Sequence, residues 1–70
     1  MKHLYRKAFE HAYEAEETAK GFHAMPGIGG LGPVEVSVKS DEGKHWVYVA
    51  LEGDVDPDEV LAATGYERVD

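Results

Sequence analysis

Residues 34–39, VEVSVK, alternate valine with polar side chains, and residues 45–51, HWVYVAL, show a similar alternation. A period of two predicts strands that each bury one face. The intervening segment, Ser40-Asp41-Glu42-Gly43, consists of turn-forming residues, and Gly43 can adopt a positive φ. We therefore predict an antiparallel hairpin with strands at 34–39 and 45–51. On the outer face of this hairpin Trp46 and Tyr48 lie opposite the valines.

Upstream of the hairpin, residues 2–20 place apolar side chains at spacings of three and four, which predicts a helix that ends at Gly21. The apolar positions are Leu4, Tyr5, Ala8, Phe9, Ala12, Tyr13, Ala15 and Ala19. Basic residues come first along this segment and acidic residues later, against the helix dipole, so tertiary contacts would have to stabilise it. Residues 21–33 are rich in glycine and include two prolines, which predicts a loop.

Downstream of the hairpin, the sequence predicts a short helix over residues 57–64. Asp56 can cap it, Pro57 suits its first position and Glu59 its third. Gly65 fits the left-handed position after the helix, and the following Tyr66 can contact Leu61 as in a Schellman motif. Residues 66–69 form a short final strand in this prediction. The expected fold is a single α+β domain over residues 1–70, in the order helix, strand, strand, helix, strand, with the hairpin sheet packed on two helices.

From Pro33 to Val69, the valine-rich hairpin is followed by Glu52-Gly53-Asp54-Val55-Asp56-Pro57-Asp58-Glu59-Val60-Leu61 and then Gly65-Tyr66. This succession resembles the second half of heavy-metal-associated domains, which have a ferredoxin-like fold. The CxxC loop of that family follows a first strand, whereas this chain has no cysteine and is predicted to begin with a helix. The resemblance therefore implies a sheet that lacks one strand, with a slot that rearranged pairing, a second copy or a partner strand could fill. It does not extend to copper or zinc transport.

Composition narrows the function classes. The chain has 70 residues, with seven basic and fourteen acidic side chains, a formal net charge of -7, 43% hydrophobic residues and no cysteine. This length holds one small core and excludes a multi-domain enzyme. The absence of cysteine excludes disulfides, thiolate zinc sites and cysteine nucleophiles. The net charge argues against direct binding of nucleic acid or anionic membranes, which requires clustered Lys and Arg. The charged start of the chain does not resemble a signal peptide, so we expect a cytoplasmic protein.

Four chemical motifs are incomplete. Gly27-Ile28-Gly29-Gly30-Leu31-Gly32 matches a phosphate-binding pattern but follows a helix and precedes a strand, the reverse of what a dinucleotide site needs. The acids from Asp54 to Asp58 alternate as in a calcium loop, yet its glycine and its final glutamate are missing. The four histidines have no metal-ligand spacing. Ser40, Asp41 and His45 have the side chains of a hydrolytic triad in one tight turn, without a pocket. We therefore predict no enzymatic activity and no cofactor.

Two features remain as candidates for function. Acidic residues gather in groups that could imitate a row of phosphates, and Trp46 with Tyr48 could anchor an interface. The candidate partner-binding residues are Glu10, Glu14, Glu17, Asp41, Glu42, Trp46, Tyr48, Asp54, Asp58 and Glu59. They predict an inhibitor or adaptor that docks on the basic surface of a nucleic-acid-handling protein, of the kind that phages and mobile elements encode. The alternative is a ferredoxin-like ligand- or metal-binding module that uses histidines and carboxylates. A homodimer is compatible with both hypotheses.

Overall fold

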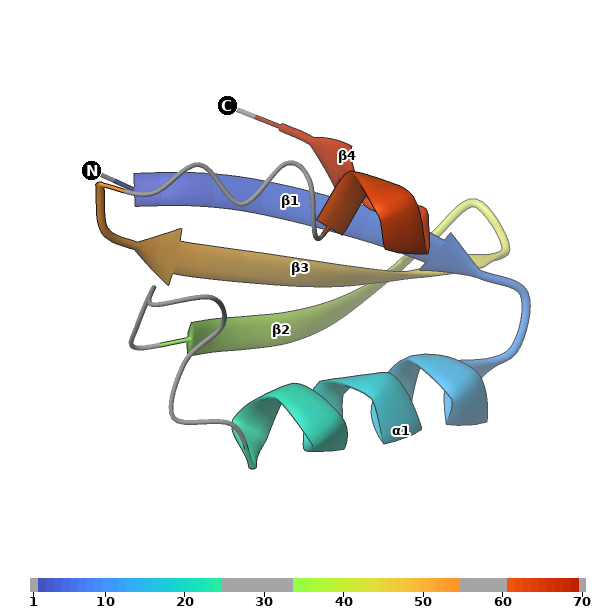
Figure 1. Ribbon diagram of the computed structural model, residues 1–70. Coiled ribbons are helices and arrows are strands. Elements are labelled where there is room, and N and C mark those ends of the chain that lie inside the picture. The colour runs from blue at the N-terminus through green and yellow to red at the C-terminus, as the bar shows by residue number, and fades with distance from the viewer. Residues whose placement is uncertain (1, 25–33, 55–60, 70) are drawn as a thin grey trace.

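The computed structural model describes residues 2–24, 34–54 and 61–69 (Figure 1). The elements are strand β1 (Lys2–Phe9), helix α1 (Ala12–His23), strands β2 (Val34–Asp41) and β3 (Lys44–Glu52), the 3₁₀ turn η1 (Ala62–Thr64) and strand β4 (Glu67–Arg68). The four strands form one sheet in the order β2-β3-β1-β4, and every neighbouring pair is antiparallel. The described part is thus an α+β structure with one α-helix on a four-stranded antiparallel sheet.

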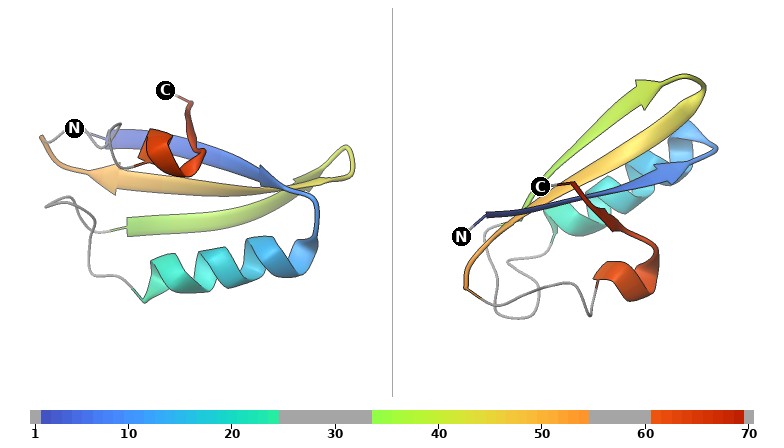
Figure 2. Two further views of the ribbon diagram at one scale, coloured as in Figure 1. Left: turned by 45° about the vertical axis from the view of Figure 1, so that its right-hand side comes forward. Right: turned by 90° about the horizontal axis from the view of Figure 1, so that it is seen from above.

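The connection from β1 through α1 to β2 is a split βαβ unit. Strands β1 and β2 are both antiparallel to β3, which lies between them, so they are parallel to each other. Figure 2 shows α1 running along one side of the sheet, with η1 and β4 near β1. Helix α1 packs against β2 and β3 more than against β1. One face of the sheet is therefore covered by α1 and η1, whereas no described helix covers the other.

Strand β1 is the main departure from the sequence-based expectation. The predicted helix over residues 2–20 is wrong for residues 2–9, which form the strand that pairs with both β3 and β4. The predicted order of elements is wrong for the same reason. The slot expected for a missing strand does not exist, because β1 occupies the position between β3 and β4. The resemblance to heavy-metal-associated domains implied such a slot only because the first strand went unrecognised.

The sequence of β1 hides its strand character because apolar residues lie on both of its faces. His3 and Tyr5 are buried on the helix-covered face, and Leu4 is half-buried on the opposite face. Lys7 stands where alternation would demand an apolar residue. Its Nζ atom instead donates to the carbonyl of Thr64 at 3.0 Å, across 57 residues of chain. Residues 2–9 therefore form a strand because of contacts with residues remote in sequence, and their own pattern of apolar residues does not predict it.

Helix α1 begins ten residues later than predicted, at Ala12, and continues through Gly21 to His23. The loop predicted from Gly21 therefore begins too early, and residues 25–33 of it lie outside the described part of the chain. With these boundaries, Glu14 lies in the first turn, while Lys20 and His23 lie in the last turn. Acidic residues near the start of a helix and basic residues near its end interact favourably with the helix dipole, so this distribution stabilises α1. For a helix over residues 2–20, the charges would have been destabilising.

The predicted hairpin is present, and each strand extends further toward the turn. Asp41 pairs with Lys44, which leaves a two-residue turn. Glu42 has φ 50° and Gly43 has φ 79°, so the positive φ expected for Gly43 is confirmed. Two successive positive φ values define the turn type whose twist matches antiparallel strands. Glu42 adopts a conformation that asparagine or glycine would tolerate better.

Of the predicted second helix over residues 57–64, the structure describes only the end: Leu61 is helical, and Ala62–Thr64 form a 3₁₀ turn. Within residues 2–24, 34–54 and 61–69, α1 is the one complete α-helix. Residues 55–60, which include the predicted cap, lie outside the described residues. The helix ending is confirmed: Gly65 has φ 90°, its N–H donates to Ala62 at 3.1 Å, and the N–H of Tyr66 donates to Leu61 at 3.0 Å. These two hydrogen bonds form a Schellman motif.

The core lies between the sheet and the two helical elements. It consists of Tyr5, Ala15, Phe22, Val47, Val49, Leu51, Leu61 and Tyr66, with Phe9 and Val36 packed against it. Phe22 of α1 meets Tyr66 edge-on, with ring centroids 5.8 Å apart. This contact joins the helix layer to the segment between η1 and β4, so the final strand is connected to α1 as well as to β1.

A candidate protein-binding face

The face of the sheet opposite α1 carries the exposed parts of Trp46 and Tyr48. In β3, Val47, Val49 and Leu51 are buried toward the helix, whereas Trp46 and Tyr48 are half-buried on the other side, as the alternation predicted. Cross-strand partners point to the same face of a sheet, so the register places Ala8 beside Trp46 and Arg6 beside Tyr48. We call this surface the aromatic face and define it by Leu4, Arg6, Ala8, Lys39, Trp46, Tyr48 and Ala50.

Both rings of the aromatic face are held by a cation. The Arg6 guanidinium lies 4.3 Å from the centroid of the Trp46 ring, and Lys39 Nζ lies 5.3 Å from that of Tyr48. Arg6 also forms an ion pair with Glu67 of β4. A hydrogen bond with Tyr48, and then the one with Glu67, raise the pKa of Arg6 above its ordinary value. Arg6 therefore remains a cation and connects β1, β3 and β4 on this face.

Two hollows flank the rings. One, of 290 Å³, is lined by Arg6, Lys7, Ala8, Trp46, Gly65 and Glu67. The other, of 320 Å³, extends over Leu4, Tyr48 and Ala50 toward Lys2 and Glu35. Both are open and near the lower limit for small-molecule sites, which enclose most of their ligand. Shallow hollows beside aromatic rings are better suited to side chains of a protein partner.

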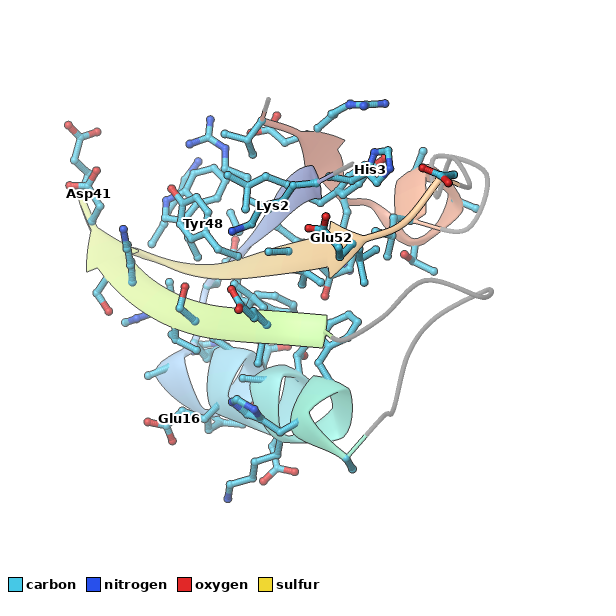
Figure 3. All side chains as sticks on the ribbon, turned by 90° about the vertical axis from the view of Figure 1, so that its left-hand side faces the viewer. Lys2, His3, Glu16, Asp41, Tyr48 and Glu52 are labelled. Atoms are coloured by element: carbon cyan, nitrogen blue, oxygen red, sulfur yellow. The ribbon has the colours of Figure 1, made fainter. Side chains whose placement is uncertain are left out.

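Charges on this side of the sheet are balanced. The register places both cations and anions on this side: Lys2, Arg6 and Lys39, and Glu35, Glu52 and Glu67. Lys2 Nζ lies 3.9 Å from Glu35 Oε2, with both side chains mostly exposed, and Arg6 forms an ion pair with Glu67. Figure 3 shows Lys2 and Tyr48 away from α1, the helix that carries Glu16. A surface with equal numbers of cations and anions has no excess charge to attract phosphates.

Most of the acidic residues predicted to bind the partner lie away from the aromatic face, although the register puts Asp41 on the same side of the sheet. Glu14 and Glu17 lie on α1, on the other side of the sheet from Trp46, and Glu10 lies in the bend before the helix. Asp41 and Glu42 are exposed at the hairpin turn, and Asp54 is exposed after β3. Asp58 and Glu59 lie outside the described residues. The structure thus divides the predicted site into an aromatic face and a separate acidic helix.

The incomplete motifs remain dispersed where the structure describes them. Ser40 Oγ lies 2.8 Å from His45 Nδ1, a cross-strand pair near the hairpin turn. Asp41 follows Ser40 directly, so its side chain points to the opposite face, and the three residues form no triad. The ring nitrogens of His3 lie 3.2 Å from the Gly53 carbonyl and 3.3 Å from Arg68 Nη2. No three His, Asp or Glu side chains gather into a metal-binding group within residues 2–24, 34–54 and 61–69.

Leu4, Arg6 and Ala8 are members of the aromatic face that the sequence did not reveal, because residues 2–9 were assigned to a helix. The alternation of His3, Tyr5 and Phe9 on one face is the single local signal that could have identified them. No helix in the described part of the chain has the length and apolar character to cross a bilayer. The chain matches no protein-family model, no curated protein and no solved structure.

Proposed function

We propose that this chain is a small acidic protein-binding domain whose aromatic face contacts a basic protein. The observation that carries the proposal is the pair Trp46 and Tyr48, side by side on a sheet face that no described helix covers and fixed by Arg6 and Lys39. Aromatic residues with ordered cations are the typical anchors of protein interfaces. The balanced charge of this face favours a protein over a nucleic acid as the molecule that it contacts.

The acidic residues on and before α1 indicate that the partner is basic. Glu14 and Glu17 are three residues apart on α1, a spacing that puts side chains about 5 to 6 Å apart on a helix, and Glu10 lies in the bend that precedes the helix. Together with a net charge of -7, they attract a basic surface and raise its association rate. Because a row of carboxylates can imitate phosphates, we propose a nucleic-acid-handling protein as the partner and an inhibitor or adaptor role for this chain.

Quantitative affinity purification from the source organism, at low and at high salt, tests this function. A partner of the proposed kind is basic and is lost at high salt. Trp46→Ala should raise the dissociation rate of the captured partner, whereas Tyr13→Ala, which removes an exposed ring from α1, should not. Replacement of Glu10, Glu14 and Glu17 by glutamine should lower the association rate.

The same experiment can refute the proposal. Capture of nucleic acid in place of protein would overturn it, as would a partner whose kinetics are unchanged by Trp46→Ala and by the triple glutamine variant. The metal-binding alternative makes a separate prediction, stoichiometric zinc, copper or nickel in native mass spectra. The positions of His3, His11, His23 and His45 give that alternative no support among the described residues.

A further inference from the structure

Strand β2 forms one edge of the described sheet. It is eight residues long, pairs with β3 without a bulge and contains no proline. All of its residues from Glu35 to Asp41 are exposed except Val36, which is half-buried. No described strand pairs with its outer side. Long regular edges are normally interrupted or covered, since their free N–H and C=O groups pair readily with another strand.

The turn determines which backbone groups point outward. A two-residue turn of this type is closed by a hydrogen-bonded pair, here Asp41 and Lys44. Hydrogen-bonded pairs alternate along an antiparallel ladder, so Ser37 and Lys39 direct their N–H and C=O groups toward β3. Val36 and Val38 direct theirs away from the sheet. Any strand added to β2 must pair with these outward groups.

The side chains of β2 are self-complementary about Ser37. If a second β2 lies antiparallel with Ser37 opposite Ser37, then Glu35 lies opposite Lys39 twice, and Val36 lies opposite Val38 twice. The two valine pairs are the hydrogen-bonded ones, as the outward groups require. The Glu35–Lys39 pairs fall at non-hydrogen-bonded positions, where the Cα atoms are only about 4.5 Å apart.

We propose that β2 pairs with β2 of a second copy of this chain in this register, which gives a two-fold symmetric dimer with a continuous eight-stranded sheet. Other registers are less favourable. A two-fold axis at Val36 places Glu35 opposite Ser37, and an axis at Val38 places it opposite Asp41, a like charge. Of these three axes, the one at Ser37 alone places Glu35 and Lys39, two of the three charged residues of β2, opposite charges of the other sign, as a self-complementary interface requires.

The dimer goes beyond the proposed function because it uses the edge of the sheet. Lys39 belongs to both surfaces, whereas Trp46 and Tyr48 lie on β3, outside the contact between the two β2 strands. In the dimer the two aromatic faces lie side by side on one continuous surface. A partner with two matching sites would then be bound bivalently, with an apparent affinity above that of one site.

Sedimentation equilibrium of the full chain, over a concentration series, tests the dimer. We expect the mass to rise from 7.7 kDa toward twice that value, 15.4 kDa. Lys39→Glu and Glu35→Lys each place like charges opposite one another twice, and each should raise the dimer Kd about tenfold or more. Lys20→Glu on α1 makes the same change in net charge as Lys39→Glu and should leave the Kd within about twofold.

Mixing the two single variants shows whether a loss of dimerisation comes from like charges in the proposed register or from a folding defect. Lys39→Glu in one chain and Glu35→Lys in the other restore opposite charges at both positions, so the mixture should form a heterodimer although neither variant dimerises well alone. The double variant Glu35→Lys/Lys39→Glu should again dimerise with itself. A wild-type chain that stays monomeric up to millimolar concentration would overturn the proposal. So would equal dimerisation of wild type and Lys39→Glu, or a mixture that fails to associate.

Discussion

Gly21→Ala should make the protein more stable, because α1 passes through this position. The residue has a helical environment, and an added Cβ would meet no atom within 4 Å. Alanine in place of glycine stabilises a helix interior by about 1 kcal/mol, and less near a helix end. Since Gly21 lies in the last turn, we expect a gain of about 0.5–1 kcal/mol, or a rise in Tm of about 2–8 °C for a domain of this size.

The matched control is Gly65→Ala, the same chemical change at a left-handed position. Gly65 has φ 90°, and a Cβ there would lie 3.4 Å from Cε of Lys7. Alanine in this conformation costs about 1–2 kcal/mol, so Tm should fall. Far-UV circular dichroism during thermal unfolding measures both variants, at one protein concentration because self-association changes Tm. If Gly21→Ala destabilises the protein as Gly65→Ala does, Gly21 ends the helix and the described boundaries of α1 are wrong.

Three further predictions follow from buried or strained groups. Burial raises the pKa of Tyr66, so the unfolded chain ionises first; stability should be complete below about pH 10 and decrease above it, and Tyr66→Phe should weaken this decrease in urea titrations at pH 9 to 11. His3→Leu leaves the Gly53 carbonyl without its hydrogen bond and should cost about 1–3 kcal/mol; an unchanged urea midpoint would contradict this. Glu42→Asn relieves a positive φ and should add about 0.5–1 kcal/mol, and a lower Tm would show that the turn differs.

The hairpin and the Gly65 ending could be predicted because their signals are local. Alternating valines, a two-residue turn and a glycine after a short helical segment each require a conformation within a few residues. The buried Val47 and the half-buried Trp46 then follow from the alternation alone. For the same reason the aromatic half of the candidate site was recognised from the sequence.

Strand β1 could not be predicted because its partners are remote. Leu4, Tyr5, Ala8 and Phe9 have a helical spacing, yet Tyr5 pairs with Val49 and with Arg68 in the sheet. Central strands are often apolar on both faces and lose the period of two. The error also assigned Arg6 to a helix, so its contact with Trp46 was missed.

The short strand β4 has a practical consequence for handling the protein. The N–H of Val69 donates to the carbonyl of Leu4 at 2.8 Å, so the first and last described strands run beside each other at one border of the molecule (Figure 1). A tether attached after Val69 would fix the protein by this border and orient β2, at the far border, toward solution. Closing the two ends with a short peptide and reopening the chain between Glu42 and Gly43 would give a circular permutant with the same sheet.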